Sequence, residues 1–294
     1  MEDEILTEEI SLEEARSALN SCKNRSAPGP DGIPNLILKN VSDHNFATII
    51  KLYNHCLNTG YFPRHWKMAT GVMIPKPGKD TTDVNSYRPI SLLNCIGKLL
   101  ERILNKRLVN FLMNKNFFNK NQKGFLPGCS CSEILYQFIE EVKMSRATSV
   151  CSKPWVTTAF SLDVERAFDS AWHDAIRYKI RKAGIHDKMT RIISSFLSNR
   201  QIRIRSGETL SRPVQLKAGT PQGSVLSPLL YLIYVNDLPL TSDDTRGGQF
   251  ADDQNGWCSS RSRRMNQIKL QHQLNKIEKF NLKWRIRLNP KSFK

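Results

Sequence analysis

The sequence predicts an α+β fold, in which a few strands are set among a larger number of helices. Of its 294 residues, 39% are hydrophobic and 24% are charged, a composition typical of a globular chain rather than a disordered one. Most periodic apolar segments have helical spacing, and short runs rich in β-branched residues interrupt them. This mixed order of helices and few strands is typical of the α+β class.

The N-terminal part predicts two helices. Ser11 and Glu14 form a capping box, so the first helix begins at the next residue after Ser11. It must end before residues 26–32, where two prolines and two glycines cannot continue a helix. A second helix fits residues 44–59, and Gly60 suits its C-terminal cap.

A strand and a long helix follow. Residues 69–75 predict the strand, and a basic loop runs from Lys76 to Tyr87. Residues 92–114 predict an amphipathic helix with its apolar side chains inward. Four basic side chains are expected to face outward from this helix: Lys98, Arg102, Lys106 and Arg107.

The remaining sequence continues the alternation of helices and short strands. We expect helices at 132–146, 172–183, 189–198, 224–236 and 262–282, strands at 156–163, 201–205 and 213–217, and a hairpin around 249–259.

The charge points to a polyanionic partner. Lys and Arg number 44 against 27 Asp and Glu, a net charge of +17, and the acidic first 24 residues place this surplus in the body of the chain. No apolar run reaches the roughly 18–20 residues of a membrane span. The acidic N-terminus fits neither a secretory signal nor a transit peptide, and the seven scattered cysteines are typical of reduced thiols in an intracellular protein.

Three aspartates stand out by their context. Asp163 ends the β-rich run 156–162, and Asp252 and Asp253 are adjacent at the expected hairpin turn. Adjacent carboxylates repel each other unless a cation is near. A carboxylate at a strand end that faces this pair could hold two Mg²⁺ ions for nucleotidyl transfer. Taken alone, an adjacent pair of aspartates is more simply explained as a solvated turn, and Asp163 as a helix cap.

Six motifs that follow one another along the chain decide between a metal site and a solvated turn. They are residues 26–33 (SAPGPDGI), 74–79 (IPKPGK), 87–92 (YRPISL), 160–169 (FSLDVERAFD), 219–228 (GTPQGSVLSP) and 250–253 (FADD). With these motifs the sequence resembles the reverse transcriptase domain of a non-LTR (LINE-like) retrotransposon over nearly its whole length. The resemblance implies a right-hand polymerase fold, with fingers and palm and a small antiparallel palm sheet flanked by helices.

The resemblance also implies the roles of the acids. Asp163 and Asp252 would ligate two Mg²⁺ ions, for which Mn²⁺ can substitute, and Asp253 would support the site. The partners implied are an RNA template, a DNA primer and deoxynucleoside triphosphates (dNTPs).

Four further residues would bind the nucleotide in this resemblance. Phe168 would block a ribose 2′-hydroxyl and so select deoxynucleotides. Arg88 and Lys76 would bind the triphosphate, Arg88 through a planar fork of donors and Lys76 as a mobile charge. Gln222, next to a glycine, would contact the nucleotide near its 3′-hydroxyl.

The domain prediction assigns residues 1–150 mainly to the fingers and 151–294 mainly to the palm, with no thumb. The segment 284–292 resembles the start of the fourth palm motif, but Ser292-Phe293 departs from the family pattern. This departure leaves open whether Lys291 acts as general acid. Polar residues 254–256 and Gly247-Gly248 are expected to weaken the hairpin, so we expect a truncated polyprotein fragment or a decayed copy.

The predicted function is RNA-directed DNA polymerisation. Two alternatives remain: a catalytically inactive nucleic-acid-binding remnant, and a reverse transcriptase of the group II intron maturase type. We expect an intracellular protein of the nucleus with no membrane association, and the sequence leaves its oligomeric state open.

Overall fold

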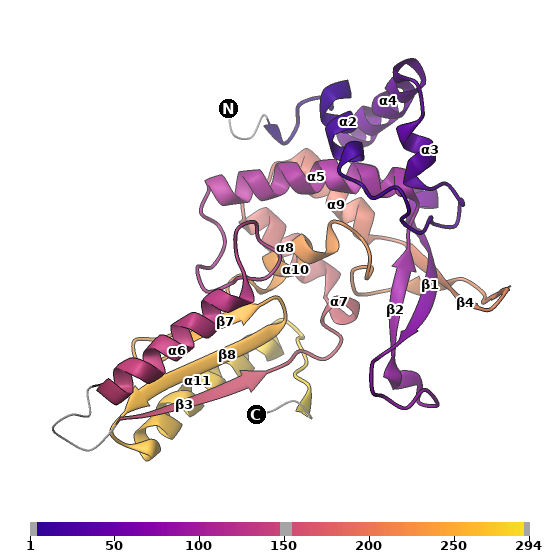
Figure 1. Ribbon diagram of the computed structural model, residues 1–294. Coiled ribbons are helices and arrows are strands. Elements are labelled where there is room, and N and C mark those ends of the chain that lie inside the picture. The colour runs from indigo at the N-terminus through magenta and orange to yellow at the C-terminus, as the bar shows by residue number, and fades with distance from the viewer. Residues whose placement is uncertain (1–4, 148–154, 291–294) are drawn as a thin grey trace. The chain divides into compact units, whose positions relative to one another are not determined.

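The computed structural model describes residues 5–147 and 155–290, which divide into two compact units (Figure 1). Unit 1 contains residues 5–117 and 176–230. Unit 2 contains residues 118–147, 155–175 and 231–290. The helices α8 (His173–Lys182) and α10 (Ser227–Val235) begin in one unit and end in the other.

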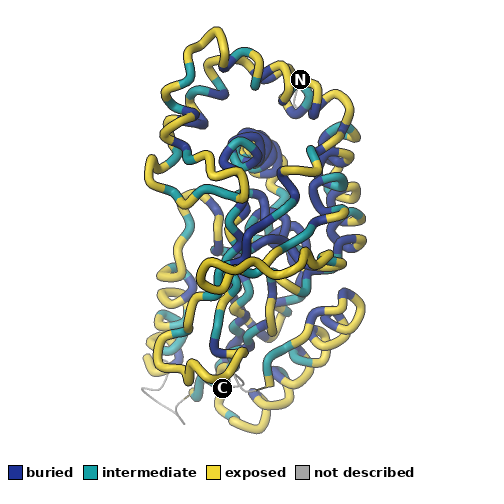
Figure 2. Tube along the Cα trace, turned by 90° about the vertical axis from the view of Figure 1, so that its right-hand side faces the viewer, coloured by how far each residue is buried: buried dark blue, intermediate teal, exposed yellow. Residues whose placement is uncertain are grey.

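The helices of unit 1 surround a buried central helix, α5 (Cys95–Asn114). It is seen end-on in Figure 2, mostly in the dark blue of buried residues. Around it lie α2 (Leu12–Asn20), α3 (Asn35–Lys39), α4 (Asp43–Thr59) and α9 (Asp187–Leu197). The N-cap at Ser11 is confirmed, because its hydroxyl accepts from the Glu14 amide, and Gly60 ends α4 with a φ of 69°. The Glu14 carboxylate accepts from Arg107 rather than completing the predicted capping box.

The sheet of unit 1 has five strands. They are β1 (Met68–Pro75), β2 (Tyr87–Leu92), β4 (Arg200–Ser206), β5 (Thr209–Leu210) and β6 (Val214–Leu216), with the 3₁₀ turns η1 (Arg64–Lys67) and η2 (Val84–Ser86) beside them. The order is β2-β1-β4-β5, and β6 also pairs with β4. β1 and β4 are parallel although about 130 residues separate them, which fixes the two halves of unit 1 to each other.

One expectation for the long helix is wrong. Arg107, expected to face outward, is buried, and its guanidinium makes a two-point ion pair with the Glu14 carboxylate at 2.8 and 2.6 Å. It also donates to the backbone carbonyl of Glu8 at 2.6 Å. Because α2 covers this side of α5, a long side chain with a charged end can be buried when a carboxylate meets it.

Unit 2 is built on a three-stranded antiparallel sheet in the order β3-β8-β7. The strands are β3 (Val156–Leu162), β7 (Arg246–Phe250) and β8 (Asp253–Ser260). The helices are α6 (Cys131–Ala147), the short α7 (Ala167–Ser170) and α11 (Arg263–Lys283). Phe138 of α6 contacts Trp257, and Asn266 of α11 bonds to Thr158, so the two helices cover opposite faces of the sheet (Figure 1).

The glycines of the β7–β8 hairpin have a packing role. The hairpin forms with five residue pairs, from Arg246↔Trp257 to Phe250↔Asp253. A Cβ on Gly248 would lie 2.6 Å from the Ile134 side chain, and one on Gly256 would lie 2.4 Å from the Phe160 ring. We expected these glycines to weaken the hairpin. In the structure they instead allow neighbouring side chains to pack closely against its backbone.

Gln254, in the same hairpin, is a polar residue in the interior of unit 2. It is fully buried, and neither atom of its carboxamide has a hydrogen-bond partner among the described residues. We expect Gln254→Met to raise the free energy of unfolding by about 1–3 kcal/mol, because an unpartnered buried polar group costs about that much. Urea denaturation would measure it. The matched control is Gln273→Met, because buried Gln273 bonds to Thr245 and Pro239; this control should be destabilised, and a destabilised Gln254→Met would contradict the prediction.

The two sheets with their helices confirm the α+β prediction. Within the described part of the chain, no helix is both long and apolar enough to cross a membrane. The six cysteines described there are all free thiols.

Candidate active site

Asp163 and the Asp252-Asp253 pair lie at one end of the unit 2 sheet. The β3–β8 ladder ends with Leu162 opposite Gln254, so Asp163 directly follows β3 at the end of the sheet where Asp253 begins β8. Phe250 pairs with Asp253, which leaves Ala251 and Asp252 as a two-residue turn. The acids, separated by about 90 residues in the sequence, are therefore neighbours in unit 2.

The charges of these carboxylates act on one another. Burial raises the pKa of Asp252, and the nearby Asp253 and Asp163 raise it further. Burial and then Asp163 also raise the pKa of Asp253. Neither shift is opposed by a cationic side chain among the described residues. The site therefore gathers negative charge, the condition that favours uptake of a cation.

The donor set fits a hard divalent cation. Within the described residues, no three His, Cys, Asp or Glu side chains could enclose a metal ion by themselves. Mg²⁺ is commonly held by only one or two carboxylates together with substrate phosphates. Asp252 and Asp163 are the residues that would hold it, and their assignment as ligands stays a prediction.

Asp163 is held in place by the last described segment of the chain. The Asn289 side chain donates to the Asp163 carboxylate at 3.0 Å, and the Asn289 amide donates to the Asp163 carbonyl at 2.8 Å. A bridge between Val164 and Leu288 continues this pairing. The sequence motif at 284–292 includes this segment, but the bond to Asp163 depends on folding. Lys291 lies outside the described residues.

Phe168 lies on a short aromatic row beside the acids. Its ring centroid is 5.3 Å from that of Tyr231 and 6.0 Å from that of Phe125. Tyr231 is buried, and the charges of Asp252 and Asp163 help to raise the pKa of its hydroxyl, after burial itself. Phe168 therefore packs against Tyr231, which lies within electrostatic reach of the carboxylates.

Gln222 belongs to unit 1, in a loop fastened to β2. Its carbonyl accepts from the Ser91 amide at 2.7 Å. A Cβ on Gly223 would lie 2.7 Å from the Ser91 carbonyl oxygen, so only glycine permits this approach. Ser91 is three residues from Arg88, so the loop that carries Gln222 meets β2 about 10 Å along the strand from Arg88.

Glu101 of α5 anchors the other end of this loop. Its buried carboxylate accepts from the Ser224 hydroxyl at 2.5 Å and from the amides of Val225 at 2.8 Å and Leu226 at 3.4 Å. No sequence signal indicates this role, because an acid on an amphipathic helix is ordinarily solvent-exposed.

Arg88 and Lys76 lie on the β1–β2 hairpin of unit 1. Arg88 is exposed and pairs with Ile74 across the ladder. Lys76 is half-buried, and its ammonium donates to the Asn85 carbonyl at 2.8 Å. The structure thus brings Asp163, Asp252, Asp253 and Phe168 together in unit 2, and sets Arg88, Lys76 and Gln222 around the β1–β2 hairpin of unit 1.

The family model described as reverse transcriptase (RNA-dependent DNA polymerase) matches residues 74–292. The chain belongs to the reverse transcriptase family. The predicted resemblance to the enzymes of non-LTR retrotransposons is confirmed by the relatives found.

Two of these relatives come from Drosophila melanogaster. The chain is 34% identical over 230 residues to the probable RNA-directed DNA polymerase from transposon BS, covering 78% of this chain and 25% of that protein. It is 30% identical over 287 residues to the RNA-directed DNA polymerase from mobile element jockey, covering 95% of this chain and 31% of that protein. The chain thus spans about a quarter to a third of the length of these two relatives.

Solved structures show the same fold at low identity. Apo telomerase from Candida tropicalis aligns with a TM-score of 0.54 and 11% identity over 86% of this chain and 55% of that one. The complex of telomerase from the same organism with a fragment of telomeric RNA gives a TM-score of 0.56, also at 11% identity, over 86% of this chain and 44% of that one.

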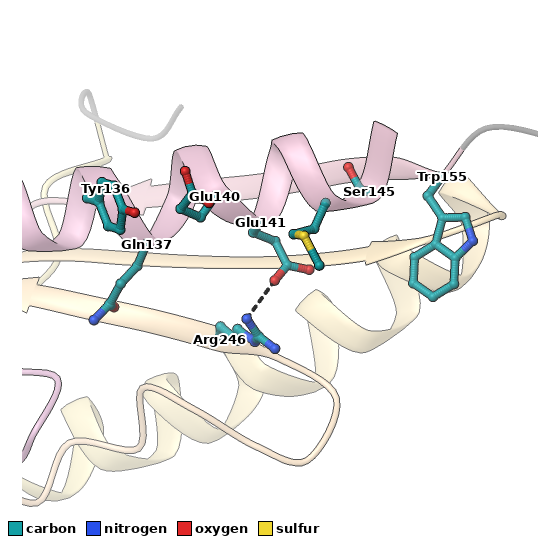
Figure 3. Close-up of a pocket in the computed structure, with 8 residues that line it drawn as sticks. Tyr136, Gln137, Glu140, Glu141, Ser145, Trp155 and Arg246 are labelled. Carbon is teal, nitrogen blue, oxygen red and sulfur yellow. Dashed lines mark ion pairs between the residues drawn. The ribbon is translucent and has the colours of Figure 1, made fainter. Parts of the chain in front are cut away.

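A pocket of this reverse transcriptase domain lies away from the acids. It has a volume of about 380 Å³, and Tyr136 and Met144 of α6 line it with Trp155 and Arg246 (Figure 3). Trp155 precedes β3 and Arg246 begins β7, whereas the aspartates lie at the opposite ends of these strands. An ion pair of 2.8 Å between Arg246 and Glu141 crosses the pocket, and none of the predicted site residues lines it.

Proposed function

We propose that this domain carries out RNA-directed DNA polymerisation. The proposal depends on one observation: Asp163 and the Asp252-Asp253 turn lie at the same end of one antiparallel sheet, where the charge of Asp163 acts on both other acids. In this proposal unit 2 contributes the palm sheet, and the β1–β2 hairpin of unit 1 contributes fingers. RNA template, DNA primer and dNTPs are the proposed substrates, and the nucleus the proposed location.

The proposed reaction is attack of a primer 3′-oxygen on the α-phosphorus of a dNTP. One P–O bond forms to the primer, and the bond to pyrophosphate breaks. Bound divalent cations would supply Lewis acidity toward the attacking and leaving oxygens. Asp163, fixed by Asn289, and Asp252 would hold these cations in position.

The other candidate residues would bind the nucleotide. The Phe168 ring would occupy the space beside the sugar C2′, which excludes a 2′-hydroxyl. The Arg88 guanidinium would donate to phosphate oxygens, and it is exposed and available to do so. Gln222 would approach the sugar from a loop whose backbone Ser91 and Glu101 hold.

Primer extension tests the proposal. The chain is incubated with poly(rA)/oligo(dT), dTTP and Mg²⁺, and we expect incorporation that needs both template and cation. Binding of the duplex without incorporation would overturn the enzymatic proposal and favour the nucleic-acid-binding alternative.

Two further arginines extend the basic surface of unit 1. Arg203 and Arg205 of β4 pair with alternate residues of β1, and Arg88 of β2 pairs with the next alternate residue. Paired residues lie on one face of a sheet, so the three guanidinium groups share a face. All three are exposed, and no ion pair engages them in the described part of the chain. This face complements the phosphates of a nucleic-acid strand.

We expect the double change Arg203→Gln and Arg205→Gln to weaken binding of an RNA–DNA duplex. Each interaction with a phosphate that is removed should reduce the magnitude of the slope of log K against log salt by about 1, so the double variant should lose about 2. Fluorescence anisotropy between about 50 and 200 mM KCl would measure this slope. The matched control is Arg191→Gln on α9, because Arg191 is exposed but paired with Asp187; equal slopes for all three chains would contradict the prediction.

A further inference from the structure

The turn that carries Asp252 contains a strained residue. Ala251 has a φ of 57°, in the left-handed region that residues with a Cβ avoid. A two-residue hairpin turn needs a positive φ at its first position, and glycine is the usual residue there. Since Ala251 directly precedes Asp252, whatever stabilises this conformation also positions the carboxylate.

Gln122 supplies that stabilisation from outside the hairpin. Its carboxamide oxygen accepts from the Ala251 amide at 3.1 Å, and its carboxamide nitrogen lies 3.4 Å from the Ala251 carbonyl, to which it donates. Gln249 donates to the same carbonyl at 2.8 Å. Gln122 is 2% exposed, so water does not compete for these bonds. Both backbone polar groups of the strained residue are therefore satisfied by buried amides.

The segment around Gln122 is fixed against the hairpin. The Lys123 amide donates to the Gln249 carbonyl at 2.8 Å, and the Gln249 amide donates to the Asn121 carbonyl at 2.8 Å. A Cβ on Gly124 would lie 2.2 Å from the Ala251 nitrogen, so the backbones touch at this point. The segment thus pairs with β7 along the edge of the sheet and reaches the turn.

Phe125 follows in the same segment. It has a φ of 55°, costly for a bulky side chain, and is 50% exposed. Its ring meets the edge of the Phe168 ring at 6.0 Å. A strained, half-exposed aromatic is typical of a functional position.

We propose that residues 122–125 form a positioning segment, in which Gln122 holds the turn that presents Asp252 and Phe125 holds the ring of Phe168. The proposal rests on the function proposed above. It assigns no catalytic residue, since neither side chain would touch the reacting atoms. One short segment thereby positions both the Asp252 carboxylate and the Phe168 ring, which is proposed to select the sugar.

The first test is Gln122→Met, which keeps the side-chain volume but removes the carboxamide. We expect the exchange rate of the Ala251 amide proton to rise at least about tenfold, because the variant has no acceptor for it. We expect the dissociation constant for Mn²⁺, measured by titration calorimetry on the chain alone, to rise about tenfold, as with other groups that orient metal ligands.

Two companion variants separate positioning from general destabilisation. Gln273→Met removes another buried carboxamide of unit 2, so it should lower stability without either effect. Adding Ala251→Gly to Gln122→Met should recover part of the Mn²⁺ affinity, because glycine adopts a positive φ without cost. If Gln122→Met and Gln273→Met give the same Ala251 exchange rate and Mn²⁺ affinity, the role of Gln122 is overturned.

The second test is Phe125→Leu. We expect the preference for dGTP over GTP in single-nucleotide incorporation to fall about 3- to 10-fold, while Mn²⁺ affinity stays unchanged. Phe138→Leu is the matched control, because Phe138 packs on Trp257 rather than on Phe168. Unchanged discrimination in Phe125→Leu overturns its part of the proposal. A wild-type chain without incorporation would instead overturn the proposed function, while the Ala251 exchange rates still decide the role of Gln122.

Discussion

We expect the Asp252→Asn chain to lose primer extension on the order of 10³-fold or more and to be more stable than the wild type without metal. Metal-assisted stabilisation of the reacting oxygens is worth several kcal/mol, and each ~1.36 kcal/mol is a factor of ten. The fold should persist, because Asp252 lies in the turn and its side chain makes no bond within either strand ladder.

The stability gain has a definite pH dependence. Burial, Asp253 and Asp163 raise the pKa of Asp252 above its unfolded value. An acid with a raised folded pKa costs stability as the pH rises from the unfolded pKa through the folded one. The variant should therefore melt like the wild type below about pH 4 and at a higher temperature near pH 7. Mg²⁺ should raise the melting temperature of the wild type more than that of the variant.

Differential scanning fluorimetry across pH, with and without MgCl₂, and primer extension measure these effects. The matched control is Asp243→Asn, an exposed acid in the loop before β7, which should leave both readouts unchanged. Incorporation by Asp252→Asn within about tenfold of wild type would refute the assignment of this carboxylate.

The neighbourhood of the three acids can be predicted because local signals and family motifs agree. The β-rich run before Asp163 predicts a strand, and Asp252 and Asp253 fall at the turn of the hairpin predicted around residues 249–259. Strand β2 is harder to predict, because Arg88-Pro89 is typical of a break and the basic loop is expected to reach Tyr87. Pro89 is tolerated because β2 is the outer strand of its sheet, where the free edge needs no donor.

The residues that support the site cannot be predicted in the same way. Gln122 and Ala251 are 129 positions apart, and an amide carries no pattern that reveals a distant partner. Asn289 meets Asp163 across 126 positions. Periodicity assigns polar residues to the surface, whereas these are buried or half-buried because each finds a specific backbone or carboxylate partner. Such pairings arise from register and topology.

Glu101 is the strongest example of a buried polar residue with distant partners. Its replacement is the second change for which we expect a large effect, here on stability. We expect Glu101→Ala to lower the free energy of unfolding by about 3 kcal/mol or more, because hydrogen bonds to a charged group contribute about 1.5–3 kcal/mol each. Three donors would lose their shared acceptor in a buried place. Buried Arg200, whose pKa burial lowers to about 10, would also lose the nearby charge that opposes this shift.

Urea denaturation measures this loss, and exposed Glu13→Ala on α2 is the matched control with little expected change. Glu101→Gln keeps one acceptor oxygen, so its stability should lie between those of the wild type and Glu101→Ala. It should still fold, which allows the kinetic consequence to be measured. The KM for dNTP should rise more than kcat falls, because the anchor of the loop that carries Gln222 is weakened while the aspartates of unit 2 are untouched. A fall in kcat alone would mean that Glu101 supports the fold but does not position Gln222.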